Sequence, residues 1–219
     1  METKTKAVQK KEKYKAEMRQ EFITAALQLI EEQGTQDLTT RKLSEITGYS
    51  YATLYNHFPN MSSLYQYCIF EHIQLLNVAV LNNPALDNLS PKERIKKLAI
   101  VFTEYLLLHP TTFELIFLVP LTTAPPHDIS DDLLKPQVIM EVRRSIVTYL
   151  EELNIPQSDY ETIIQIFLNH LTGRLLFYFR RTKQSDYAAT RSVSCFEDQF
   201  KHSIENEVDW LLRSISLTR

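Results

Sequence analysis

Glycine is scarce in this chain, with only three among 219 residues. Tight β turns and phosphate-binding loops both depend on glycine, so its scarcity argues against a β-rich fold and against a glycine-rich nucleotide loop. The two cysteines, Cys68 and Cys195, lie far apart in sequence and have no partners at metal-ligand spacing. We therefore expect two reduced thiols packed in helices rather than a disulfide or a zinc site.

Long hydrophobic runs are also missing, and the N-terminal segment lacks the apolar stretch of a secretory signal. Six histidines are scattered without a pair at metal-ligand spacing, and no nucleophile elbow occurs. The alternative class, an all-α enzyme, would need catalytic or metal-binding motifs of this kind, and the sequence has none of them. The sequence therefore predicts a cytoplasmic protein that is not an enzyme, with no metal, no cofactor and no membrane association. Its hydrophobic content of 44% permits a sizeable core, and all-α is the expected fold class.

The segment Thr39–Phe58, TTRKLSEITGYSYATLYNHF, has the pattern of two short helices joined by a glycine turn. Thr39 and Ser50 are N-cap residues for the first and second helix. Gly48 suits the turn between them, where a β-carbon would crowd the backbone. Such a turn also joins ordinary helix hairpins, so the function depends on the faces of the two helices.

Both helices are amphipathic. Leu43 and Ile46 form the expected buried stripe of the first helix, and Leu54 and Phe58 that of the second. The other side chains of the second helix are donors and stacking surfaces, namely Tyr51, Thr53, Tyr55, Asn56 and His57. An exposed helix this polar and aromatic suits the major groove of DNA.

This segment resembles the N-terminal helix-turn-helix of TetR-type transcriptional repressors. In that family a Thr-Thr-Arg-Lys-Leu start and a Thr-Leu-Tyr-x-His-Phe end recur, and both stand here, at Thr39–Leu43 and Thr53–Phe58. The resemblance is sequence-specific over about residues 22–64, and beyond that it rests on length and helical patterning. Met61 stands where the family usually has a phosphate-contacting lysine, and Tyr51-Ala52 replaces the more usual Lys, Arg or Gln followed by Gly or Pro.

Side-chain chemistry and the resemblance together imply a set of DNA contacts. Phosphate contacts are expected from Thr40, Tyr55 and His57, and the helix starting near Met61 can add backbone N–H groups. Base-edge contacts are expected from Arg41, Ser50, Tyr51 and Thr53, with Ala52 offering a methyl surface. Arg41 is the candidate for a bidentate guanine contact. Tyr55 and His57 have an alternative interpretation as local contacts at a helix end.

The first nineteen residues carry seven lysines and arginines against three glutamates, whereas the whole chain has a net charge of −3. A basic arm on a mildly acidic protein can lie along phosphates or in the minor groove, or can be a solvated tail. We assign residues 1–64 to a DNA-binding domain with this arm, and residues 65–219 to a helical effector-binding and dimerisation domain.

Helical spacing continues through this second domain. Asn60 caps a connector helix over 61–81, and Ser90 with Glu93 forms a capping box for a helix that ends near His109-Pro110. Ser158 with Glu161 forms a second capping box for a helix to about residue 183. The remaining expectations are a short apolar helix over 111–121, a loop over 122–128 and a last helix over about 193–216. Between them a helix is expected over about 130–154, either bent or begun anew at Pro136.

The helix over 158–183 is apolar around most of its circumference, so it needs burial on two sides. One side can face the chain's own core and the other a twin subunit, with Gly173 permitting close approach and the last helix completing a four-helix interface. Homodimerisation on a palindromic operator is also what the resemblance implies.

An effector pocket is expected between the connector and the inner helices. Its candidate residues mix aromatic walls with polar anchors: Phe102, Tyr105, His109, Phe117, Met140, His170, Arg174 and Tyr178. Each has an alternative interpretation as a core residue. Arg174 needs a partner in so hydrophobic a helix, either a ligand anion or Glu104, Glu114 or Glu141.

The sequence thus predicts a TetR-type regulator, a homodimeric repressor that binds a double-stranded DNA operator and is released by a small-molecule effector. The alternatives are a TetR-like regulator that answers to a partner protein, and one that activates transcription.

Overall fold

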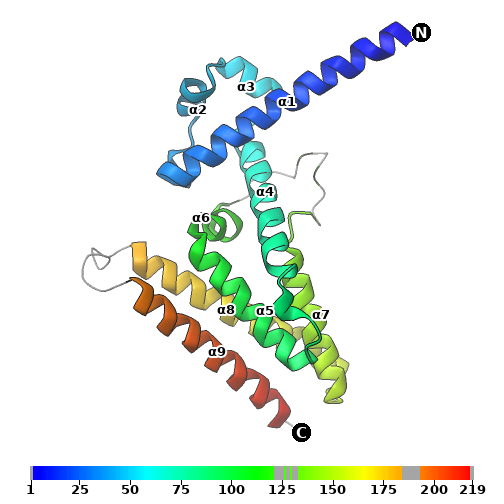
Figure 1. Ribbon diagram of the computed structural model, residues 1–219, viewed down its shortest axis with the longest axis vertical. Helices are drawn as coiled ribbons and strands as arrows, with labels where there is room; N and C mark the ends of the chain where they lie inside the picture. The colour runs from blue at the N-terminus through cyan, green and yellow to red at the C-terminus, as the bar shows by residue number, and fades with distance from the viewer. Residues whose placement is uncertain (1, 121–125, 127–128, 130–132, 184–192, 218–219) are drawn as a thin grey trace. The chain divides into compact units, whose positions relative to one another are not determined.

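A computed structural model describes residues 2–120, 126, 129, 133–183 and 193–217, without the side chains of residues 2–9, 11, 182, 183, 193–197 and 217. The described residues form helices, turns and loops and contain no strand (Figure 1), which confirms the all-α prediction. The longer helices are α1 (Glu2–Gln33), α2 (Thr40–Thr47), α3 (Tyr51–His57), α4 (Met61–Leu81), α5 (Pro91–Leu108), α7 (Gln137–Glu152), α8 (Tyr160–Lys183) and α9 (Val193–Leu217). Shorter elements are α6 (Pro110–Phe113), the π-helical segment η3 (Glu114–Leu118), and the 3₁₀ turns η1 (Thr35–Asp37), η2 (Pro84–Leu86) and η4 (Gln157–Asp159).

The chain divides into two compact units. One, called the head here, contains Met1–Ile73 and Thr111–Leu134, and the other, called the body, contains Gln74–Pro110 and Lys135–Arg219. Helix α4 belongs to the head up to Ile73 and to the body from Gln74. The assignment of residues 1–64 to DNA binding and of 65–219 to effector binding and dimerisation stays a prediction.

Aromatic and aliphatic side chains of α1 form the centre of the head core. Phe22 is fully buried, and its ring lies 5.5 Å from that of Tyr49 and 6.1 Å, edge to face, from that of Phe58. Phe58 in turn meets Tyr67 of α4 edge to face at 5.5 Å. These rings join α1 to the α2–α3 segment and to α4, so the core fixes where α3 lies within the head.

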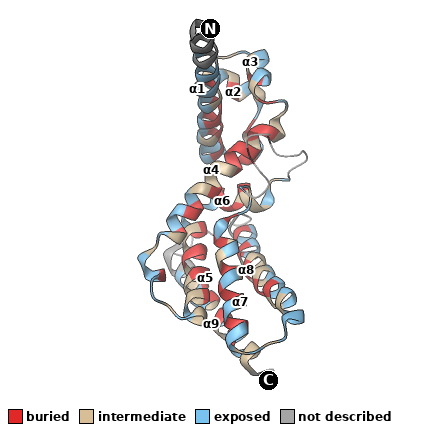
Figure 2. Ribbon diagram, turned by 90° about the vertical axis from the view of Figure 1, so that its right-hand side faces the viewer, coloured by how far each residue is buried: buried red, intermediate tan, exposed pale blue. Residues whose placement is uncertain are grey.

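In the body, α5 packs against α7 and α9, and α8 packs against α7 and α9. Buried residues line the facing sides of these helices (Figure 2). Across the interface of α5 and α9, Lys96 Nζ donates to Asp209 Oδ1 at 3.0 Å. Between α7 and α4, Asn77 Oδ1 accepts from the backbone N–H of Val138 at 3.2 Å.

Several helix ends lie where local signals place them. The connector helix occupies 61–81, with Asn60 Oδ1 accepting from the N–H of Ser63 at 2.8 Å. Helix α5 begins with the full capping box of Ser90 and Glu93, and α9 matches the expected last helix to within one residue.

One capping prediction was wrong, and one open alternative was decided. The second capping box does not form, because the Glu161 carboxylate binds Arg143 and Gln165 and the Ser158 hydroxyl donates to Asp159, so that α8 begins only at Tyr160. Helix α7 begins at Gln137, which confirms the alternative that a helix begins anew at Pro136, since Pro136 cannot donate to a preceding turn.

Two further expectations changed in detail. The short apolar helix ends at Leu118 and is π-helical from Glu114, and of the 122–128 loop only residue 126 lies among the described residues. The basic N-terminal segment is not a separate arm, because its backbone forms the first turns of α1.

No single described helix is long and apolar enough to cross a membrane. Only the bent pair Pro91–Leu108 and Pro110–Leu118 passes that test of length and composition together.

Candidate nucleic-acid interface

The α2–turn–α3 segment is built by local hydrogen bonds at each helix end. Thr39 Oγ1 accepts from the N–H of Lys42 at 3.3 Å, and Ser50 Oγ accepts from the N–H of Thr53 at 3.2 Å. Gly48 ends α2 with φ of 73°, a left-handed conformation that favours glycine. Both predicted N-caps and the predicted glycine turn are therefore confirmed.

Helix α3 has only seven residues, which is too short to be stable alone in water. Leu54 and Phe58 hold it, since both are almost completely buried in the head core together with Leu43 of α2. Ile46 was wrongly assigned to this core, because it is 48% exposed. The head core therefore covers less of the α2 surface than the spacing of Leu43 and Ile46 predicts.

The outward side of α3 carries its polar and aromatic residues. Tyr51 and Tyr55 are 50% and 49% exposed, Ala52 is exposed, and Thr53 is half-buried. Ser50, at the start of the helix, is exposed, but its hydroxyl oxygen already accepts the N–H of Thr53. The same hydroxyl lies 3.0 Å from that of Thr53. The structure thus brings these predicted DNA-contacting residues together on one short helix.

On α2, Thr40 is half-buried and Arg41 is exposed. The Arg41 Nε donates to Glu45 Oε1 at 2.9 Å, one turn along the same helix, in a pair whose side chains are largely exposed. Sequence reasoning missed Glu45, although its spacing of four residues from Arg41 is the ordinary signal for such a pair. An exposed ion pair of this kind is weak enough to be exchanged for a nucleic-acid contact.

His57 differs from the other candidates because its ring is partly buried, 6.0 Å from the ring of Phe22. Burial lowers the pKa of His57, and the charges of Lys15 and Arg19 lower it further. Nδ1 is buried without a hydrogen-bond partner among the described residues, which leaves Nε2 as the nitrogen able to reach a phosphate.

Met61 stands at the first position of α4 and is partly buried against the head core. Its side chain therefore has a packing role at the position where a lysine is more usual. Asn60 accepts from the N–H of Ser63 in the first turn of α4, as expected of a cap, and the use of this helix start for a phosphate stays a prediction.

The effector-site candidates lie on several elements, α5, η3, α7 and α8, or at their ends, and their role in effector binding stays a prediction. Within the body, Phe102 and Tyr178 are buried and Met140 is 44% exposed. The Tyr105 ring lies 4.4 Å from that of exposed His109, tilted by 36°. Tyr178 packs in the core against Phe179 and Phe200, with ring centroids 5.3 Å and 4.6 Å away. Phe117 belongs to the head, where its ring stacks on that of Phe113 at 5.1 Å.

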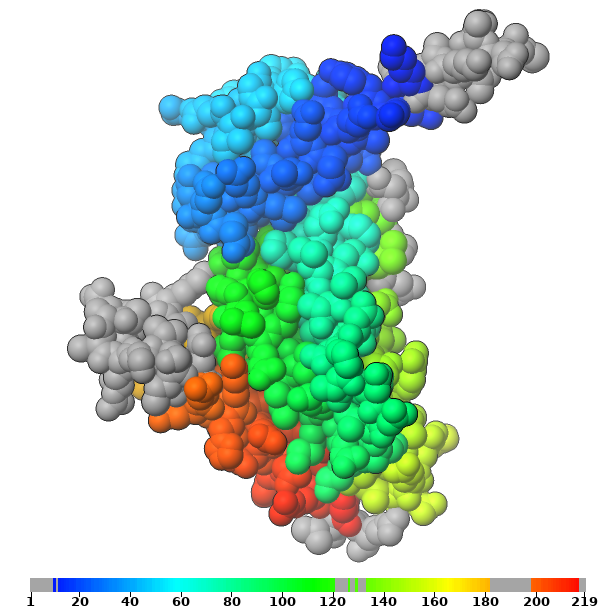
Figure 3. Space-filling view, viewed as in Figure 1, coloured from blue at the N-terminus to red at the C-terminus, as the bar shows by residue number. Residues whose placement is uncertain are grey.

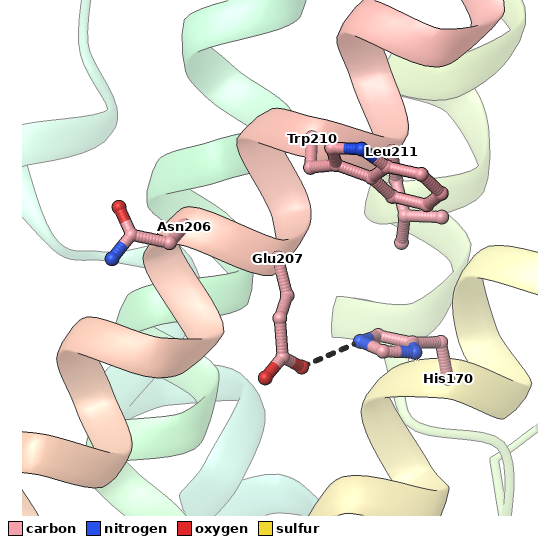
Figure 4. Close-up of a pocket in the computed structure, with 5 residues that line it drawn as sticks. All are labelled: His170, Asn206, Glu207, Trp210 and Leu211. Atoms are coloured by element: carbon pink, nitrogen blue, oxygen red, sulfur yellow. Dashed lines mark hydrogen bonds and ion pairs between the residues drawn. The ribbon is translucent and has the colours of Figure 1, made fainter.

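His170 and Arg174 share one partner, which α9 supplies. His170 Nε2 lies 2.8 Å and Arg174 Nε 3.0 Å from Glu207 Oε2, while Arg174 Nη2 donates to Ser203 Oγ at 3.0 Å. The partner of Arg174 is therefore Glu207 and none of the three glutamates that the sequence suggested. His170 and Glu207 also border a hollow of about 520 Å³ with Asn206, Trp210 and Leu211 (Figure 4).

Comparison with known proteins supports a regulatory function for the head. Residues 22–68 match the family described as bacterial regulatory proteins, tetR family. No curated protein matches the chain.

Solved structures share the whole fold at low sequence identity. A TetR from Streptomyces coelicolor is 16% identical with a TM-score of 0.58, covering 91% of this chain and 97% of its own. A TetR variant from Acinetobacter baumannii in complex with minocycline is 18% identical with a TM-score of 0.59, covering 90% and 96%. FadR from Bacillus subtilis in complex with stearoyl-CoA is 11% identical with a TM-score of 0.60, covering 86% and 96%.

Proposed function

We propose that this chain is a TetR-type DNA-binding transcriptional regulator, a homodimeric repressor that a small-molecule ligand releases from a palindromic operator. The observation that carries the proposal is α3, a capped helix held by two buried residues with its polar and aromatic side outward. Two such helices in a two-fold dimer would read two half-sites one helical turn apart.

In this proposal the head contacts have separate tasks. Thr40, Tyr55 and His57 bind phosphates and set the register, whereas Arg41, Ser50, Tyr51 and Thr53 face base edges and Ala52 adds a methyl surface. Ser50 contributes chiefly by capping α3, because its oxygen already accepts the N–H of Thr53. Arg41 leaves its ion pair with Glu45 and binds a guanine base.

Release by a ligand requires a connection between effector binding and the heads. Helix α4 belongs to both units, so a ligand that favours another conformation of the body can change the separation of the two heads. A coupling of about 1 to 3 kcal/mol lowers DNA affinity roughly 5- to 150-fold, which is enough to release a gene from repression. Two of the structural relatives named above were solved with ligands as different as minocycline and stearoyl-CoA, so the fold does not restrict the ligand class.

The test is a salt titration of binding to a palindromic fragment from the gene's own upstream region, measured by fluorescence anisotropy. Arg41→Ala should reduce the ratio of specific to nonspecific affinity roughly 5- to 150-fold, while Tyr55→Phe should weaken binding to all sequences alike. Arg144→Ala, which removes an exposed arginine of α7, is the matched control. If Arg41→Ala and Arg144→Ala bind alike, α2 and α3 do not read the operator as proposed.

A further inference from the structure

The side of α1 that packs in the head core changes from apolar to basic toward the start of the helix. Phe22 is fully buried in the core, and Arg19 and Lys15 precede it at spacings of three and four residues, so all three share one side of α1. Arg19 is half-buried and Lys15 is exposed. Two cations therefore lie just beyond the edge of the core, and the farther one is about 10 Å from Phe22 along the helix.

Helix α3 ends close to these two cations. It packs against α1, and Figure 3 shows α1, in dark blue, and the α2–α3 segment, in lighter blue, side by side on the surface. The ring of His57, in the last turn of α3, lies 6.0 Å from that of Phe22. The charges of Lys15 and Arg19 act on His57 strongly enough to lower its pKa. Basic groups from two helices thus meet at one corner of the head.

These basic groups differ in how firmly they are held. Arg19 Nη1 donates to the Tyr67 hydroxyl at 3.1 Å, and its guanidinium lies over the Tyr67 ring, so α4 fixes its place. The Nδ1 edge of His57 is buried, which directs Nε2 outward. Lys15 forms no ion pair within the described part of the chain. A fixed imidazole and a flexible ammonium can therefore meet at one anion.

The helical form of the N-terminal segment limits how it can contact DNA. A helix with its side chains is about 10–12 Å across, whereas the minor groove of B-DNA is about 6 Å wide. The start of α1 is helical and therefore cannot enter the minor groove. Because the proposed function assigns the major groove to α3, the basic side of α1 is left with the phosphates between the grooves.

We propose that Lys15 of α1 and His57 of α3 bind the same phosphate of the operator backbone, with the charge of Arg19 beside them. The imidazole supplies a directed N–H donor, and the ammonium supplies the full positive charge. A phosphate held from two helices fixes the position of α3 along the groove more firmly than one donor does. This inference rests on the proposed function, which assigns a phosphate to His57 alone.

A salt titration of Lys15→Gln against Lys13→Gln tests the contact. Lys13 pairs with Glu17 and lies about two and a half turns before Phe22, hence on the opposite side of α1. Both variants remove one positive charge from the same helix. Lys15→Gln should reduce the slope of log affinity against log salt by about 0.9 per head, which is roughly eightfold in affinity between 1 M and 0.1 M salt. Lys13→Gln should leave the slope nearly unchanged. A random-sequence duplex serves as well as the operator fragment, because phosphate contacts do not depend on sequence.

Neutral methylphosphonates, placed at one backbone position of the operator fragment at a time, locate the phosphate. Where wild type loses affinity at the shared position, Lys15→Gln and His57→Gln should both have lost their sensitivity, because the contact is already gone. Lys13→Gln should keep the sensitivity of wild type. Loss of sensitivity at two different positions would mean that the two residues bind different phosphates.

An NMR titration tests the geometry without DNA. Like charge lowers the pKa of His57, so Lys15→Gln should raise this pKa in the free protein and Lys13→Gln should leave it unchanged, with His57→Gln identifying the resonance. An unchanged pKa in Lys15→Gln would place the two groups too far apart to share a phosphate.

The outcomes separate the inference from the proposed function. Wild type that binds no duplex at low salt would remove the proposed function and this inference with it. Binding without sequence preference would remove the operator, while the random duplex still decides the role of Lys15. Wild type that binds the operator, with equal salt slopes for Lys15→Gln and Lys13→Gln, would overturn the shared phosphate alone. A reduced slope in Lys15→Gln with one shared position supports it.

Discussion

Replacing Glu45 with glutamine should tighten DNA binding, although Glu45 lies on one of the two helices that are proposed to read DNA. In the free protein the Glu45 carboxylate holds Arg41 through an exposed pair at 2.9 Å. A helix pair of this kind changes an equilibrium by a factor of about two, whereas a bidentate guanine contact changes it roughly 5- to 150-fold. In the proposed complex Arg41 therefore leaves Glu45 when DNA binds, so that Glu45 opposes binding.

Two effects add in Glu45→Gln. Arg41 no longer has to break its pair, which contributes up to about twofold. The carboxylate no longer repels phosphates, and one charge about 10 Å from a phosphate in water contributes about another factor of two. The variant should bind the operator about two- to fourfold more tightly at low salt, and the gain should shrink as salt rises because screening shortens the range of repulsion.

Fluorescence anisotropy between 50 and 300 mM salt, roughly the range over which phosphate contacts lose most of their strength, measures this gain. Glu151→Gln makes the same change of charge at an exposed position of α7 in the body and serves as control. Equal affinities of Glu45→Gln and Glu151→Gln, or a loss in the former, would refute the reasoning. In that case Glu45 holds Arg41 in its binding position, or Arg41 does not contact DNA.

Other perturbations have equally definite outcomes. The pKa of His57 is lowered in the free protein and should rise beside a phosphate, so DNA affinity should increase as pH falls from about 7.5 to 6, and His57→Gln should abolish this dependence in the same anisotropy assay. Leu54→Ala should lower the stability of the head by about 2 to 5 kcal/mol in urea unfolding, against less than about 1 kcal/mol for half-exposed Ile46→Ala; equal effects would contradict the assignment of Leu54 to the core. The hydrogen bond from Lys96 lowers the pKa of Asp209, so this carboxylate contributes stability above its unfolded pKa and loses it as pH falls through the folded value. Asp209→Asn should therefore reduce stability at pH 7 and flatten its decline below about pH 4, which thermal unfolding across pH would detect.

The predictions that succeeded depend on residues close together in sequence. A cap needs a side chain and an N–H group three residues apart, and Ser50 and Ser90 meet that condition whatever the rest of the chain does. The glycine turn at Gly48 and the proline start of α5 are local for the same reason.

The predictions that failed involve competition from distant residues. The spacing of Glu161 from Ser158 allows a capping box, but Arg143 lies close to Glu161 in the folded body and binds its carboxylate. Arg174 finds Glu207 on α9, a helix that no spacing rule connects to α8. Charged groups bind the partner that folding brings nearest, and sequence distance gives no measure of that.

The sequence by itself determined the all-α class, the helix-turn-helix and the polar surface of α3, because caps, turns and helical periodicity act over a few residues. Only the tertiary structure decided which sides of those helices are covered. It left Ile46 half exposed, buried the Nδ1 edge of His57, and left Phe177 exposed on α8. Burial is a property of how helices pack against one another, and the same amphipathic pattern is compatible with many such packings.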